Sequence, residues 1–308
     1  MKYSVTKEQI IAGSTADILK NIANFNNWST WSPWACLDPQ TITNCRDDYL
    51  AWESRFTGTG NMQRIAQTDA SVEISLQFVK PFKSKAHAIF KLEPISSSTI
   101  KVIWTMESRL PLFLIFFKKL FQAMISNDFK RGLTRLKYLV ETGKVPCRIE
   151  YVDEPQSIEA FTATGISTSC TAENIGKSMH TTFEKLGELM IESGITPIKM
   201  VALYDKTDLV KAKFDYTAAA IHDGVAINKP GLNTRNVPAH KAIKVILHGN
   251  YEFMSDAWSG IYTHLRGLKL KADKFVVPYD VYIKGPMDTE NPNDYVTEIY
   301  LPVKVTSH

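Results

Sequence analysis

One acidic residue near the C-terminus, Glu298, has neighbours that suggest binding chemistry. In the segment DYVTEIYLPV at 294–303, strand alternation puts Glu298 and Tyr300 on one side, opposite a more apolar side. A carboxylate beside aromatic rings can hold a lipophilic cation, because the cation supplies the missing charge and stacks on the ring. The alternative is a solvent-exposed Glu298 that pairs with Lys304 or Lys284.

Aromatic residues on other strand-like segments extend the candidate binding chemistry. Tyr282 lies in KFVVPYDVYIKG, and Phe214 and Tyr216 lie in VKAKFDYTAAAI. We expect these three side chains to contribute to a pocket with Glu298. In the first half of the chain, Trp52 and Trp104 are candidates for a second, hydrophobic cavity, although a curved sheet could use the same tryptophans as core.

Other kinds of site are not indicated. The four cysteines show no metal-ligand spacing, so we expect a reduced, cytoplasmic chain without metal or cofactor. The seven histidines are scattered, and no serine nucleophile motif occurs. A net charge of +4 is too mild to indicate nucleic acid binding, and we find no helix-turn-helix candidate.

The first half, residues 1–145, predicts an α+β domain. A strand and a short helix are followed by a meander of strands and a long amphipathic helix at 117–143, which suggests an antiparallel sheet wrapped around a helix. Basic residues on that helix are expected on its solvated face, and the alternative is an anionic partner; they are Lys118, Lys119, Lys130, Arg131, Arg135 and Lys137. The apolar run LPLFLIFF at 110–117 is too short to span a bilayer, so it either packs as a buried or lid segment or touches a membrane.

The second half, residues 146–308, repeats one pattern. The segment KVPCRIEYVDEPQSIE at 144–159 looks like a joint, after which the order βαββ occurs twice with a helix at 173–193 and another at 251–268. Two such units predict a pseudo-twofold module. With one helix for each unit, the helices can cover one face of the combined sheet and leave the other open.

Two family resemblances fit these patterns. Residues 1 to about 143 resemble the START-like superfamily (SRPBCC, polyketide-cyclase-like) through NWSTWSPWACLDP, AWESRFTGTGNMQRI, LQFVKPFKS, VIWTMES and FKRGLTRLKYLVE. That resemblance implies a helix-grip fold with an apolar cavity. Residues from about 147 to 305 resemble the GyrI-like effector-binding module through ILHGNY, VPYDVYIKGP and ENPNDYVTEIYLPVKV. Asn250 departs from the proline that is more common in that family.

The second resemblance implies a binder of lipophilic, often cationic, small molecules, with Glu298 as the pocket acid and Tyr300 and Tyr282 as walls. The leading hypothesis is therefore a sensor, carrier or sequestering protein. Two alternatives stay open. One is an enzyme, either a hydrolase that uses Glu298 and Tyr282 or a cyclase or lyase in the first domain. The other is a regulatory module that binds a protein partner, as gyrase inhibitors of the family do.

Overall fold

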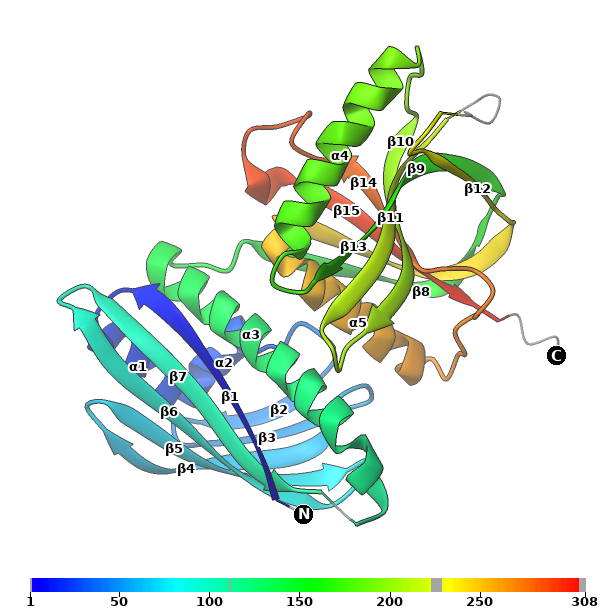
Figure 1. Ribbon diagram of the computed structural model, residues 1–308. Coiled ribbons are helices and arrows are strands. Elements are labelled where there is room, and N and C mark those ends of the chain that lie inside the picture. Colours follow the sequence, from blue (N-terminus) through cyan, green and yellow to red (C-terminus); the bar gives the residue numbers. More distant parts are fainter. Residues whose placement is uncertain (1, 111, 223–228, 305–308) are drawn as a thin grey trace. The chain divides into compact units, whose positions relative to one another are not determined.

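The computed structural model describes residues 2–110, 112–222 and 229–304. Pro111 and Val305, which the predicted segments include, lie outside the described residues. The chain divides into two compact units, Met1–Pro146 and Cys147–His308, each with its own antiparallel sheet (Figure 1). No helix among the described residues combines the length and apolar character needed to cross a bilayer.

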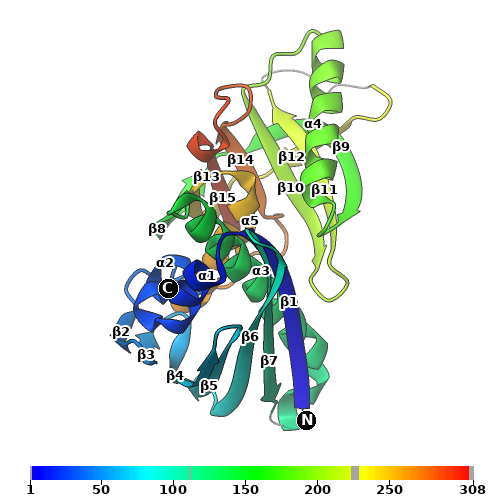
Figure 2. The same cartoon turned by 90° about the vertical axis from the view of Figure 1, so that its left-hand side faces the viewer.

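The first unit is a seven-stranded antiparallel sheet packed against the 25-residue helix α3. Strand order in the sheet is β1-β7-β6-β5-β4-β3-β2, so consecutive strands pair except where β1 joins β7 (Figure 2). Its elements are β1 Lys2–Ala12, α1 Thr15–Ala23, η1 Phe25–Asn27, α2 Trp28–Trp31, β2 Ile42–Arg46, β3 Tyr49–Ser54, β4 Gly58–Thr68, β5 Ser71–Lys80, β6 Ser84–Ser96, β7 Thr99–Arg109, η2 Leu112–Phe117 and α3 Lys118–Thr142.

Two of the basic residues predicted on the solvated face of the long helix are buried instead. Arg131 is 2% exposed; it donates to the carbonyl of Pro33 (3.0 Å) and pairs with Asp128 (2.7 Å). Arg135 is 6% exposed and donates to the carbonyl of Thr30 (3.2 Å). The prediction was wrong because helical periodicity does not show that a loop with free carbonyls lies over this side of the helix. Both arginines fasten the tryptophan-rich loop to α3.

The second unit is an eight-stranded antiparallel sheet that curls into a half-barrel (Figure 1). Strand order is β12-β9-β11-β10-β14-β15-β13-β8. The unit β9-α4-β10-β11 and the unit β13-α5-β14-β15 occupy equivalent places on either side of the β10-β14 pair. The elements are β8 Cys147–Ile158, β9 Phe161–Thr171, α4 Ile175–Glu192, β10 Lys199–Asp208, β11 Lys213–Ile221, β12 Asn233–Val237, β13 His240–Gly249, η3 Tyr251–Phe253, α5 Met254–Gly267, β14 Tyr279–Lys284, η4 Pro292–Asp294 and β15 Val296–Val303.

Most of the segment predicted as an interdomain joint is a strand. Residues Cys147–Ile158 form β8, which pairs with β13 at one edge of the second sheet. Strand β12, which the sequence pattern also missed, pairs with β9 at the opposite edge. Both strands are polar and proline-adjacent, as tolerated at a sheet edge where only one side needs backbone partners.

A glycine in β9 permits close strand pairing and gives a first prediction. A Cβ atom on Gly165 would lie 2.0 Å from the carbonyl oxygen of Ala218 and 2.5 Å from Cα of Ala219, so backbone would have to move. Gly165→Ala should destabilise the second unit by roughly 1–3 kcal/mol, measured by chemical denaturation of the full chain. Gly187→Ala is the matched control, because Gly187 lies within helix α4 with open space around it. It should be neutral or stabilising by up to about 1 kcal/mol; equal losses in the two variants would contradict the packing argument.

Candidate functional site

Asp280 is a buried acid with no cationic partner among the described residues. It lies in β14, its side chain faces the helices, and it has 0% exposure. The Tyr204 hydroxyl donates to its Oδ2 at 2.7 Å. Its Oδ1 has no hydrogen-bond partner within the described residues, where no lysine, arginine or histidine forms an ion pair with it either. A polar atom buried in this way costs free energy unless a ligand or water satisfies it.

Burial decides the protonation state of this acid. Burial raises the pKa of Asp280 to about 8, although hydrogen bonding by Tyr204 and by the Trp258 indole opposes the rise. The Trp258 N–H approaches Asp280 but does not reach full hydrogen-bond geometry, and it has no other partner within the described residues. At neutral pH the group is therefore mostly a neutral acid that an incoming cation could ionise.

Aromatic rings surround Asp280 on the same face of the sheet. The Trp258 ring on α5 packs edge-on against Tyr204, with centroids 5.0 Å apart. Tyr282 contacts Phe183 of α4 and Tyr251 of η3, with centroids 5.2 Å and 5.6 Å apart. We call this group the Asp280 cluster; its members are Asp280, Tyr204, Tyr282, Trp258, Phe183 and Tyr251.

Helix α4 covers the Asp280 cluster loosely at its N-terminal end. Residues Ile175, Met179 and Phe183 pack against the sheet there, yet none of the residues 175–185 is fully buried. The first buried side chains of α4 are Leu186 and Met190, in its C-terminal half. In contrast, α5 has eight buried residues within its 14. The N-terminal half of α4 is therefore the part of the cover that costs least to displace.

Glu298 lies on the opposite face, which the helices leave bare. Its side chain is 17% exposed. Lys244 Nζ contacts Oε1 at 2.9 Å, and the Tyr300 hydroxyl donates to Oε2 at 2.6 Å. Tyr300 stacks on Tyr279, with centroids 5.0 Å apart and 13° between the planes. Burial alone would raise the pKa of Glu298, but hydrogen bonds from Tyr300 and Lys244 outweigh it and hold that pKa below its usual value.

Strand register separates the residues predicted to form one pocket. In the β14–β15 pair, Val281 lies opposite Glu298, whereas Tyr282 lies opposite Thr297 and so faces the other way. Tyr216 and Phe214 pack with Tyr282 on the helix-covered face, and the Tyr216 hydroxyl lies 2.7 Å from the Ser178 hydroxyl of α4. Tyr300 alone of the predicted aromatic residues shares the Glu298 face. Glu298 and Tyr282 therefore cannot act together on one small substrate.

Comparison with known proteins agrees with the second resemblance. Residues 156–304 match the family model of the GyrI-like small molecule binding domain. This segment is a GyrI-like domain. No curated protein matches the chain. Similar solved structures include the EcmrR C-terminal domain (20% identity, covering 51% of this chain and 99% of that one, TM-score 0.42). Others are SAV2435 bound to tetraphenylphosphonium (14%, 50% and 94%, 0.38) and a START superfamily protein from Mycobacterium smegmatis (13%, 46% and 99%, 0.35).

Within the GyrI-like domain, sequence reasoning missed Asp280 and Tyr204 and assigned Trp258 to the core. A signal for Asp280 was present: an aspartate in the middle of an apolar strand, two residues before a tyrosine, is unfavourable in a sheet and calls for a reason. Lys244, in the apolar run AIKVIL, carried a similar signal. Its pairing with Glu298 depends on strand register, which the sequence does not give.

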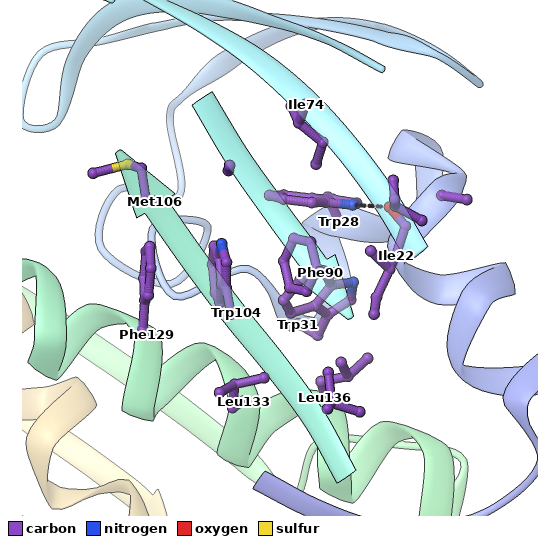
Figure 3. Packing of buried hydrophobic residues seen from close by; sticks show 14 of the residues in the cluster. Ile22, Trp28, Trp31, Ile74, Phe90, Trp104, Met106, Phe129, Leu133 and Leu136 are labelled. Carbon is purple, nitrogen blue, oxygen red and sulfur yellow. Dashed lines mark hydrogen bonds between the residues drawn. The ribbon is translucent and has the colours of Figure 1, made fainter. Parts of the chain in front are cut away.

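The two tryptophans predicted to line a cavity in the first unit differ in their surroundings. Trp104 stacks on Phe129 (centroids 3.9 Å, planes 7° apart) and on Phe90 (4.7 Å, 28°), so both ring faces are covered and it lies in the core (Figure 3). Trp52 is half-buried and has a single ring contact among those described, edge-on to Phe78 at 5.9 Å. Among the described residues, no group of three His, Cys, Asp or Glu is placed to hold a metal ion.

The pair of Lys244 and Glu298 gives a second prediction. Lys244→Met leaves a half-buried carboxylate without its cation, so the GyrI-like domain should lose about 1–2 kcal/mol of stability in denaturant titrations. The double variant Lys244→Met, Glu298→Gln should recover most of that loss, since the uncompensated charge is gone. If the double variant is as unstable as the sum of both single variants, the two groups are not coupled.

Proposed function

We propose that the chain binds lipophilic cations at the Asp280 cluster, with the Asp280 carboxylate as the counter-charge. The observation that carries this proposal is the burial of Asp280 with one oxygen unpartnered and no cation beside it within the described residues. A bound cation would satisfy that oxygen, and each ring placed against the cation would add about 0.5 to 2 kcal/mol. The GyrI-like match at 156–304 supports small-molecule binding in this domain.

The comparison of the two acids favours Asp280 over Glu298 as the ligand acid. Glu298 already has a resident cation in Lys244, whose Nζ also lies 5.7 Å from the Tyr300 ring centroid. A ligand at Glu298 would have to displace this lysine and leave it unpaired. No such competitor lies beside Asp280 in the part of the chain that the structure describes, so the Coulomb attraction of its carboxylate is available to a ligand. Of the residues predicted from sequence, Tyr282 belongs to the Asp280 cluster, and Tyr216 and Phe214 pack beside it on the same face. Glu298 and Tyr300 become a structural pair.

Binding requires that part of the cover over Asp280 moves. We place this movement in residues 175–185 of α4, which have no fully buried side chain. Leu186 and Met190 keep the rest of the helix on the sheet. A ligand with flat aromatic groups would then replace the contacts of Met179 and Phe183 with contacts to its own rings.

A titration with tetraphenylphosphonium tests the proposal, because this rigid cation has no titratable group and is the ligand named for SAV2435. Calorimetry reports the binding in the natural chain. Fluorescence of Trp258 reports it in a folded variant in which the five tryptophans of the first unit are replaced by phenylalanine. Asp280→Asn should lower the affinity for tetraphenylphosphonium by roughly 100-fold. The affinity for the neutral triphenylphosphine oxide should change by less than about threefold.

Glu298→Gln is the matched control for this titration. It removes the charge of a half-buried acid on the other face of the same sheet, and it should leave the affinity for tetraphenylphosphonium within about threefold of the natural chain. Equal weakening of the cation by Asp280→Asn and Glu298→Gln would count against the assignment. If Asp280→Asn lowers the affinities for the cation and for the neutral analogue equally, the site does not recognise charge.

The START-like assignment of the first unit stays a prediction. We infer that Trp52, which is half-buried and has one described ring contact, is the better of the two predicted tryptophans to line a cavity in this unit. Trp104 is excluded from such a site by its stacked neighbours.

A further inference from the structure

One end of the first sheet carries a row of three cationic side chains. Lys2 at the start of β1 lies directly opposite Arg109 at the end of β7. Lys85 of β6 precedes Ala86, which pairs with Ser108, so Lys85 lies beside Arg109 on the other side. Like charges on neighbouring strands repel, and none of the three forms an ion pair within the described residues. Such a row is stabilised when an anion neutralises it.

The cations line a surface groove. Its volume is about 610 Å³, and its charged or titratable lining residues are Lys2, Lys83, Lys85, His87, Glu107 and Arg109. Only Glu107 is acidic, so the groove is positive overall. Ser84 and Ser108 also line the groove. Groups of this kind recognise phosphate and carboxylate oxygens.

Exposed aromatic side chains follow the groove residues in the sequence. Leu110 lines the groove, and η2 begins two residues later at Leu112. At the end of η2, Phe116 is 93% exposed and Phe117 is 52% exposed. Lys118 and Lys119 come next, and neither forms an ion pair within the described residues. Phenylalanine rings held in water beside lysines are costly for a free surface and favourable at an interface.

We propose that this end of the first unit, defined by Lys2, Lys85, Arg109, Phe116, Phe117 and Lys118, docks on an anionic lipid bilayer. Phosphate groups of the lipids neutralise the cation row, and the two phenylalanine rings enter the boundary between headgroups and acyl chains. A nucleic acid would neutralise the cations but would offer no apolar layer to Phe116 and Phe117. A bilayer offers both partners at once: phosphate groups for the cations and an apolar layer for the rings.

Flotation of the full chain with lipid vesicles tests the proposal. Vesicles of phosphatidylcholine with about a third of phosphatidylserine should bind the chain, and binding should fall as salt is raised. Vesicles of phosphatidylcholine alone should bind at least tenfold more weakly. Lys85→Gln with Arg109→Gln should weaken binding to the anionic vesicles by roughly 25-fold, at about fivefold for each charge. Phe116→Ser should weaken it by about tenfold.

Matched controls come from the second unit. Phe275 is 90% exposed, and Phe275→Ser removes an equally exposed ring; Lys177→Gln removes an exposed charge from α4. Both should leave vesicle binding unchanged. Because all the substituted side chains are exposed, thermal unfolding should be unchanged in every variant.

Three outcomes would overturn the proposal. The first is equal binding to neutral and anionic vesicles, or no binding to either. The second is binding of inorganic phosphate to the groove, detected by calorimetry, without vesicle binding, which would indicate a site for a soluble anion. The third is a gel shift of duplex DNA without vesicle binding, which would indicate a nucleic acid partner for the same cations.

Discussion

Raising the pH from about 4 to about 8 is expected to destabilise the second unit by on the order of 5 kcal/mol, because the unfolded chain releases the Asp280 proton in this range while the folded chain retains it. The pKa of Asp280 is about 8 in the folded chain and 3.8 as an ordinary carboxyl. Between these values the folded state holds a proton that the unfolded state has released. Unfolding is therefore favoured as the pH rises through this window, and the effect levels off above the folded pKa.

Variants of the Asp280 cluster separate this effect from other titrations. Asp280→Asn cannot ionise, so the fall in stability between about pH 5 and about pH 9 should be nearly absent, apart from a pH-independent cost for the buried amide. Tyr204→Phe removes the hydroxyl that donates to Asp280 at 2.7 Å, so the pKa should rise further and the loss should extend to higher pH. Glu298, whose pKa is lowered, acts below about pH 4.5 and in the opposite sense.

The measurement is chemical denaturation at several pH values, with the transition of the second unit followed separately. Trp258 is the single tryptophan of residues 147–308, so its fluorescence reports that unit once the signal of the first unit has been subtracted. A natural chain whose stability is flat from about pH 5 to about pH 9 would mean that Asp280 titrates as an ordinary acid, and the proposed counter-charge would lose its physical basis.

A group that costs several kcal/mol at neutral or alkaline pH needs a reason to be present. Replacing a buried, incompletely satisfied acid by an apolar residue of similar size commonly stabilises a protein. Residues that reduce stability in this way concentrate at binding and catalytic sites. The loss of stability that Asp280 causes is therefore an argument for ligand binding that is independent of any similarity to other proteins.

Much of the fold follows from local sequence patterns. Alternation in SVEISLQFVK puts Val72, Ile74 and Leu76 in the core of the first unit, and all three are buried there. The order βαββ, found twice, predicts the pairing of two similar halves, which the strand order shows. Strands β8 and β12 escaped prediction because their residues are polar, and their partners come from distant parts of the sequence.

The site was harder to predict because its geometry depends on register and on depth. Alternation correctly places Glu298 and Tyr300 on one face of β15, but it cannot reveal that Lys244 of another strand neutralises the acid. For Asp280 the decisive fact is complete burial beneath Trp258, which comes from α5 packing on the sheet. Such packing is a tertiary property, and a single aspartate in a strand does not encode it.

The affinity for a permanent cation should rise with pH in a way that only Asp280 explains. Binding of tetraphenylphosphonium requires the ionised carboxylate, so at pH values below about 8 the dissociation constant should fall about tenfold for each unit of pH increase. From about pH 7 to about pH 9 the gain should be roughly tenfold, with a plateau above. Calorimetry in buffers of different ionisation enthalpy should detect the release of about one proton for each cation bound at neutral pH.

Three comparisons make this result specific to the buried acid. Asp280→Asn should bind the cation weakly, with no dependence on pH and no proton release. Triphenylphosphine oxide, which carries no charge, should bind the natural chain best when Asp280 is protonated, so its affinity should fall slightly as the pH rises. Glu298→Gln should keep the full pH dependence of the natural chain, because Glu298 is already ionised throughout this range. If Glu298→Gln loses the pH dependence and Asp280→Asn retains it, the ligand binds instead on the face of the sheet that the helices leave bare.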